Sequence, residues 1–166
     1  MIKNNIVIEG AKIGFRNFSG EAGKFNPVGR RNFCVFLEHD LGKLLEEDGW
    51  NVRYLTPKDE GEDPKPYLQV AVSYENIPPK IVLVTKKAKT IMDETSINIL
   101  DWAEISSVDL IIRPYNWEIN NKEGLKSGVK AYVKSMYVVI VEDEFESKYH
   151  DVPDSAQNAV KDFNVD

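Results

Sequence analysis

The strongest alternation of apolar and polar positions lies between Ser106 and Asp143. It predicts one long β-hairpin, with strands at Ser106–Ile119 and Gly128–Val141 and a polar turn at 120–124. Successive side chains of a strand point to opposite faces of the sheet. The face predicted to lie in the core carries Val108, Leu110 and Ile112 on the first strand and Val129, Ala131, Val133, Tyr137, Val139 and Val141 on the second.

The opposite face of this hairpin mixes cations with aromatic rings. Its members are Ile111, Arg113, Tyr115 and Trp117 on the first strand and Lys130, Tyr132, Lys134 and Met136 on the second. Cations for phosphates and flat rings for unstacked bases are what a protein needs to hold a single-stranded nucleic acid. Ordinary cross-strand pairs on a solvated face give the same pattern, so the hairpin alone leaves both interpretations open.

The rest of the chain supplies short strands and one clear helix. The pattern predicts strands at Ile6–Phe15, Asn32–Leu37, Trp50–Pro57, Tyr67–Tyr74 and Lys80–Thr85, a helix at Leu41–Asp48 capped by Asp40, and a short helix or turn at Thr95–Trp102 that Trp102 anchors to the core. Six or seven strands without alternating β–α units favour an all-β domain with one or two short helices. A small antiparallel Greek-key barrel of the oligonucleotide-binding (OB) type suits this strand number.

Two further segments carry candidate nucleic-acid contacts. The glycine-rich loop between Phe15 and Arg31 interleaves basic and aromatic side chains, of which the candidates are Arg16, Phe18, Lys24, Phe25, Arg30 and Arg31. A basic turn after the strand at 80–85 adds Lys86, Lys87 and Lys89. The alternatives are that the loop rings fill a minor core and that the lysines form a solvated turn.

The net charge of −6 is concentrated at the C-terminus. Residues 142–166 hold eight carboxylates and two lysines, whereas acidic and basic side chains are equal in number over residues 1–141. We therefore expect residues 1–145 to form an OB-fold-like nucleic-acid-binding domain and residues 146–166 an acidic, flexible tail. The alternative for this tail is a C-terminal helix packed on the barrel.

Cysteine usage and the N-terminus bear on the compartment. Cys34 is the single cysteine, so no internal disulfide can form and a reducing compartment is expected. The first residues lack the apolar core of a signal peptide, and no apolar run approaches the length of a membrane span. These observations predict a cytoplasmic protein.

Four blocks of sequence, Ile6–Ala11, Arg31–Leu37, Asp48–Val52 and Ile112–Phe145, together resemble bacteriophage-encoded single-stranded DNA-binding proteins of the OB fold. The resemblance implies a role in DNA replication or recombination, an aromatic and basic DNA groove, and an acidic C-terminal tail that recruits partner enzymes. The tail residues to which it assigns partner binding are Asp162, Phe163 and Asp166. In this chain the aromatic residue stands three places before the end, which departs from the pattern.

Catalysis has little support in the sequence. His39 and His150 are the only histidines, no base stands near Cys34, and no CxxC pair, HExxH motif or nucleophile elbow is present. We predict a non-enzymatic protein without cofactor or metal that coats single-stranded DNA in the bacterial host. The alternatives are a phage structural or adaptor domain that binds protein only, and a metal-dependent nuclease using carboxylates such as Glu9, Asp109 and Glu118. A homodimer is compatible with the sequence.

Overall fold

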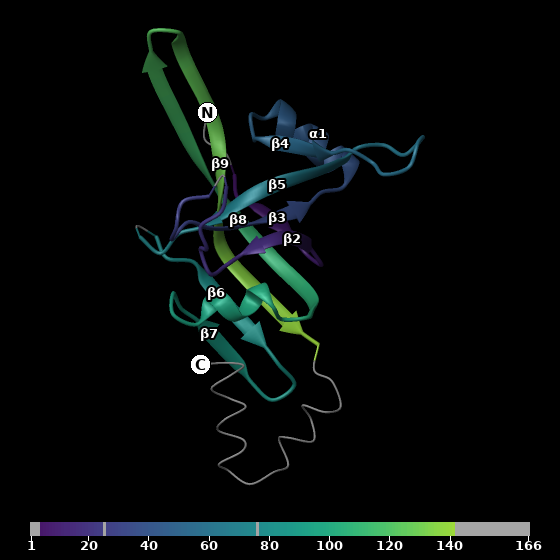
Figure 1. Cartoon of the computed structure of the whole chain (residues 1–166), viewed down its shortest axis with the longest axis vertical. Coiled ribbons are helices and arrows are strands. Elements are labelled where there is room, and N and C mark those ends of the chain that lie inside the picture. Colours follow the sequence, from purple (N-terminus) through teal and green to yellow (C-terminus); the bar gives the residue numbers. More distant parts are fainter. Residues whose placement is uncertain (1–3, 25, 76, 142–166) are drawn as a thin grey trace.

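The computed structural model describes residues 4–24, 26–75 and 77–141, and Figure 1 shows the arrangement of its elements. These are β1 (Ile6–Ile8), β2 (Lys12–Asn17), β3 (Arg31–Phe36), α1 (His39–Glu47), β4 (Val52–Leu55), β5 (Lys65–Val72), β6 (Lys80–Val84), β7 (Lys89–Met92), the 3₁₀-helix η1 (Ile97–Asp101), β8 (Ile105–Asn121) and β9 (Gly124–Ile140). The described residues therefore form the predominantly β domain with one α-helix that the sequence predicts.

The nine strands of the described residues belong to one sheet, in the order β1-β8-β9-β5-β3-β2, with β4 added to β5 and the β6–β7 pair added to β9. No hydrogen-bonded ladder joins the two ends of this path among the described residues. Instead the chain itself joins them, because β1 bends at Gly10 (φ +62°) and continues as β2. Most pairings are antiparallel as expected, but β9 pairs in parallel with both β5 and β6.

The long hairpin is present, and a β-bulge changes which of its residues are buried. Ile111 pairs with Ser135 and Ile112 with Val133, so β9 contains one extra residue, Lys134. A bulge of this kind reverses the alternation beyond it. The predicted core face is right up to Val133, but beyond the bulge the buried residues are Met136 and Val138, whereas Tyr137, Val139 and Val141 are partly or well exposed.

The hairpin is also longer than predicted. Its strands run to Asn121 and from Gly124, leaving only Lys122 and Glu123 in the turn, and Gly124 adopts φ +116°. Beyond the rest of the sheet the two strands continue as an arm that projects from the body (Figure 1). Ile119 and Leu125 near its tip are exposed.

Several element boundaries differ from the predictions. The strand predicted at 6–15 is divided at Gly10, and the helix begins at His39, so Asp40 lies in its first turn rather than at its cap. Gly49 ends that helix as expected, with φ +94°. Trp102 does not anchor η1, since its side chain is 68% exposed. The core under η1 is filled instead by Ile97 and Leu100.

Candidate nucleic-acid interface

One outer face of the sheet carries the predicted hairpin residues, and the pairing register shows which of them are neighbours. Across β8 and β9, Trp117 lies opposite Gly128, Tyr115 opposite Lys130 and Arg113 opposite Tyr132. Tyr132 in turn pairs with Ala71 of β5. The cations and rings that the sequence places on the hairpin therefore form one surface over β8 and β9, and this surface meets β5 at Ala71.

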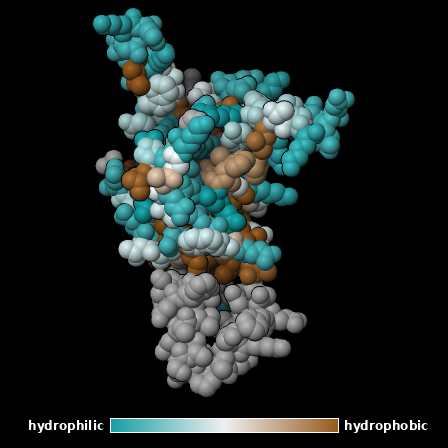
Figure 2. Space-filling model, in the orientation of Figure 1, coloured by the Kyte–Doolittle hydropathy of each residue, from teal (hydrophilic) through white to brown (hydrophobic). Residues whose placement is uncertain are grey.

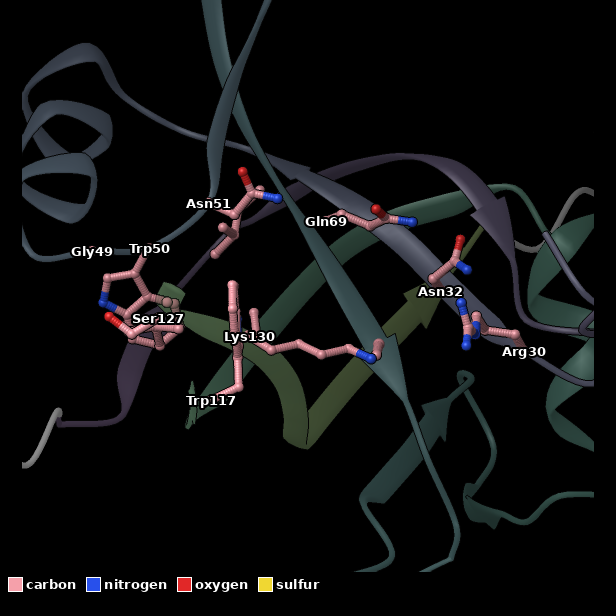
Figure 3. A pocket seen from close by; sticks show the side chains of 14 residues that line it. Arg30, Asn32, Gly49, Trp50, Asn51, Gln69, Trp117, Ser127 and Lys130 are labelled. Atoms are coloured by element: carbon pink, nitrogen blue, oxygen red, sulfur yellow. The ribbon is translucent and has the colours of Figure 1, made fainter. Parts of the chain in front are cut away.

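A groove of about 500 Å³ opens on this face. It lies where one edge of β5 passes from pairing with β4, at residues 65–68, to pairing with β9, at residues 70 and 71. Because β4 and β9 diverge here, Trp50 and Val129 form the floor of the groove. Trp50 is only 4% exposed. The groove's labelled side chains, seen in Figure 3, include Arg30, Asn32, Asn51, Gln69, Trp117 and Lys130.

Trp117 forms one wall of the groove and lies against a glycine. A Cβ atom built on Gly128 would stand 2.7 Å from Cζ2 of the Trp117 indole, closer than carbon atoms approach in proteins. The absence of a side chain at residue 128 therefore allows the indole to lie on the strand. In Figure 3 the Lys130 side chain extends from the Trp117 end of the groove toward Arg30 and Asn32.

Tyr132 is surrounded by charged and aromatic neighbours. The Arg113 guanidinium carbon lies 4.7 Å from the centroid of its ring and the Lys130 Nζ lies 5.0 Å from it. Tyr115 meets the same ring edge-on at 6.0 Å, and 53% of the Tyr115 side chain is exposed. Cation–π contacts orient these cations beside a ring that an incoming base can reach.

A second hollow of about 540 Å³ continues the groove beyond Lys130 and Tyr132. Arg31 lies here between the Tyr74 ring, 6.0 Å from its guanidinium carbon, and the Glu94 carboxylate at 3.7 Å. Burial raises the pKa of Tyr74 to about 12, and the nearby Asp93 and Glu94 act in the same direction against Arg31. Among the described residues, the buried Nε atoms of Arg31 and Arg113 have no hydrogen-bond acceptor.

Phe18 and Arg16 stabilise the fold, so the prediction that they contact a nucleic acid is wrong. Phe18 is fully buried and stacks on Phe33 at 5.1 Å, so it fills the core rather than contacting a nucleic acid. Arg16 donates from Nη1 to the carbonyl oxygens of Leu100 (2.8 Å) and Ala103 (2.7 Å) and thereby fastens β2 to η1.

The same anchoring involves Asp101. Its carboxylate accepts hydrogen bonds from the backbone N–H groups of Phe18 (2.6 Å) and Ser19 (3.0 Å) and from the Ser19 hydroxyl (2.6 Å). The alternative that the loop folds back on the domain is thus correct for its first part. Its last part differs, because Arg30 is exposed and lines both hollows.

The other candidates lie at or beyond the margin of the groove. Lys24 is exposed in the loop, Phe25 lies outside the described residues, and Lys134 is exposed at the bulge. Lys86 and Lys87 are exposed in the β6–β7 turn, and Lys89 is exposed at the start of β7. Because Val84 pairs with Val139, seven residues along β9 from Tyr132, this turn is about 23 Å from the groove and the structure does not bring it to the site.

Sequence reasoning missed several residues of the groove. Gln69 was detectable, because the alternation of β5 points it outward together with Tyr67 and Ala71. Asn32, Asn51 and Trp50 carry no pattern that identifies them, since their roles arise from the divergence of β4 and β9. The amides offer both donors and acceptors to base edges.

Nothing in the described residues suggests a metal centre or a reactive thiol. No group of three or more histidine, cysteine, aspartate or glutamate side chains is arranged to hold a metal ion within that part of the chain. Burial raises the pKa of the Cys34 thiol, with Arg53 opposing the shift. None of the helices among these residues is long and apolar enough to cross a membrane. The predicted tail contacts Asp162, Phe163 and Asp166 lie outside the described residues.

Comparison with known proteins identifies the family. Residues 1–166 match the family model described as "Putative phage ssDNA-binding domain". The chain belongs to this family. Single-stranded DNA binding, which the sequence predicts, is thereby confirmed for this phage ssDNA-binding domain. A search of the curated proteins found no match.

Solved structures support the fold of the phage ssDNA-binding domain. The single-stranded DNA-binding protein from bacteriophage Enc34, solved in complex with ssDNA, superposes with a TM-score of 0.51 at 11% identity, over 85% of this chain and 89% of that chain. Its C-terminally truncated form gives a TM-score of 0.50 at 13% identity, over 84% and 87% of the two chains. The predicted OB-fold-like architecture is confirmed.

Proposed function

We propose that this protein coats single-stranded DNA without sequence specificity, through the groove between β4, β5 and β9, during phage DNA replication or recombination. The observation that carries this proposal is the row of Trp117, Lys130 and Tyr132, of which Trp117 and Lys130 line the groove and Lys130 and Tyr132 line the second hollow. Rings and cations alternate along it at the spacing of a β-strand. Every base has a π-face, so stacking of this kind tolerates any sequence.

In this mechanism the aromatic rings contact the bases and the cations contact the phosphates. Tyr115, Trp117 and Tyr132 stack on bases, each worth ~1–3 kcal/mol of binding free energy. Arg30, Lys130 and Arg113 replace the counterions of phosphate groups, and the release of those ions makes the affinity depend on salt. Arg31 contributes less than Arg30, because its side chain is 18% exposed and already faces Glu94.

Residues 1–145 act as the DNA-binding domain, and residues 146–166 act as an acidic tail through which replication or recombination proteins are recruited in the cytoplasm of the bacterial host. The carboxylates of residues 142–166 support this division. The protein works stoichiometrically and not as an enzyme, because its groove offers rings, amides and cations rather than a nucleophile beside a base.

A titration of intrinsic tryptophan fluorescence with oligo(dT), at two salt concentrations, tests the proposal. Of the three tryptophans, Trp117 lines the groove wall, Trp50 its floor, and Trp102 is absent from its lining. We expect DNA to quench the emission of Trp102→Phe as it does the native protein, and quenching to be largely lost in Trp117→Phe. A folded protein that shows no salt-dependent binding of oligo(dT) would instead be an adaptor domain that binds protein only.

A further inference from the structure

A second group of aromatic rings lies on the same outer face, across β5 from the groove. Phe36 of β3 and Tyr67 of β5 are register partners, and Phe15 of β2 completes the cluster. The centroid of the Phe15 ring lies 6.3 Å from that of Phe36 and 6.2 Å from that of Tyr67. We call these three residues the β2–β3–β5 platform. In Figure 2 a brown patch lies on the viewed face where Figure 1 places β3 and β5.

The pairing register shows that the platform and the groove share one face. Gln69, which lines the groove, pairs with Cys34, and Cys34 pairs with Gly14. Tyr67 is two residues from Gln69 on β5 and therefore points to the same side. Tyr132 stands beside Ala71, four residues from Tyr67, so about 13 Å of β5 separates the two sets of rings.

The backbone of Phe15 is held in a conformation that its burial does not explain. Phe15 has φ +48°, the only positive φ of a non-glycine residue in the described part of the chain, at an irregularity of β2 between Gly14 and Asn17. This region is unfavourable for a side chain with a Cβ atom. The ring gains little from burial in return, since 63% of it is exposed. Strain retained at an exposed aromatic residue is typical of binding sites.

Phe36 lies against a glycine in the way that Trp117 does. A Cβ atom on Gly14 would stand 2.9 Å from Cε2 of the Phe36 ring, just as one on Gly128 would meet the Trp117 indole. An aromatic ring over a strand glycine also stabilises a sheet. Stability alone, however, does not require the neighbouring Phe15 ring to stand exposed beside it.

Cations of β2, β4 and β5 lie beside the platform. The Lys65 Nζ lies 5.1 Å from the centroid of the Phe36 ring, and the register places Lys12 opposite Phe36 and Arg53 opposite Tyr67. Next to Phe36, Lys12 and Lys65 also border a further hollow, and there they meet the carboxylates of Glu9, Glu38, Glu62 and Asp63. The carboxylates make this hollow less favourable for a phosphate backbone than the platform is.

We propose that Phe15, Phe36 and Tyr67 form a second base-stacking site for the single strand that fills the groove, and that this site marks one end of the DNA path. This inference rests on the proposed function and extends it. A DNA strand that leaves the groove over Gln69 and Cys34 reaches the platform. An oligonucleotide that is only long enough to fill the groove does not contact the platform, whereas a longer one does.

The decisive variant is Phe15→Gly, which removes the ring and relieves the unfavourable φ angle. We expect its melting temperature to be no lower than that of the native protein. Affinity for a long oligo(dT) should fall roughly tenfold, as expected for the loss of one stacked base. Affinity for the shortest oligo(dT) that fully quenches Trp117 should not change. Phe15→Tyr, which keeps a ring, is the matched control and should bind both lengths as the native protein does.

The outcomes separate this inference from the proposed function. Unchanged affinity of Phe15→Gly for the long oligonucleotide, or an equal loss with both lengths, would overturn the second site. Absence of binding by the native protein would overturn the proposed function itself. Ultraviolet crosslinking of the native protein gives an independent measurement: adducts on Phe15, Phe36 or Tyr67 with the long oligonucleotide only support the site, and adducts confined to Trp117, Tyr115 and Tyr132 refute it.

Discussion

Trp117 and Gly128 face each other across β8 and β9, and the indole occupies the space that any side chain at residue 128 would need. The position of this ring is therefore set by its partner strand as much as by its own. Gly128 does not adopt a positive φ, so the backbone there accepts other residues. What a side chain at residue 128 would disturb is the ring.

Gly128→Ala should accordingly weaken single-strand binding without unfolding the protein. The new methyl group has to displace the indole from the groove wall, so we expect a loss of about 1–3 kcal/mol, the size of one stacking contact. Oligo(dT) titration and a thermal melt measure the two effects. Ser107→Ala, at an exposed position of β8 outside the lining of the groove, is the control. Native affinity in Gly128→Ala would show that the orientation of Trp117 does not matter for binding.

Tyr132→Ala should also reduce affinity by about 1–3 kcal/mol, because the ring stacks on a base and holds the Arg113 and Lys130 cations in place. We expect the melting temperature to stay close to that of the native protein. Binding per folded molecule is the quantity to compare. If the variant unfolds while the folded fraction binds normally, Tyr132 has a structural role in the sheet and no role in DNA binding.

Arg30→Ala should make the salt dependence of binding shallower. Each phosphate neutralised on a single strand contributes about −0.7 to the slope of log affinity against log salt. Arg30 is exposed and lines both hollows, so we expect the slope to change by about that amount when one such contact is lost. Lys87→Ala, in the distant β6–β7 turn, serves as the charge-matched control. An equal change in both variants would mean that the DNA path extends to that turn.

The raised pKa of Tyr74 makes the stability of the fold depend on alkaline pH. Its pKa is raised from 10.0 to about 12, chiefly by burial, so the folded protein favours the neutral phenol. The unfolded chain loses this proton at lower pH than the folded one, and the resulting stabilisation is complete below pH 10 and is lost as the pH rises toward 12. Tyr74→Phe should flatten the decline of the melting temperature over that range. Phenolate absorbance should show one late-titrating tyrosine that is missing in this variant.

The sequence predicted the parts of the fold that depend on local alternation. The faces of β5 and β8, the end of α1 at Gly49 and the pairing of the two hairpin strands follow from residue period and glycine positions. The bulge at Lys134 was not predictable in this way. Apolar and polar residues still alternate before and after the extra residue. The bulge therefore becomes apparent only when β9 is paired with β8.

The candidate site was predicted where neighbours in sequence are neighbours in space, and missed where they are not. Arg113, Tyr115, Lys130 and Tyr132 share one hairpin. The burial of Phe18 depends on Asp101, 83 residues away, and the groove depends on how β4 and β9 divide the edge of β5. Contacts of such sequence separation leave no periodic trace, so a loop rich in rings and cations looked uniform although its two ends have different roles.

The short strand β1 has a protective consequence for the whole sheet. Its three residues cover the outer edge of β8 at Leu110, Ile111 and Ile112. Without them, the free N–H and C=O groups of an apolar strand would face solvent and could pair with another molecule. We expect a variant lacking residues 1–8 to self-associate on warming, measured by light scattering, at temperatures where the full chain stays dispersed. The three residues of β1 would then prevent the edge of β8 in one molecule from pairing with a strand of another.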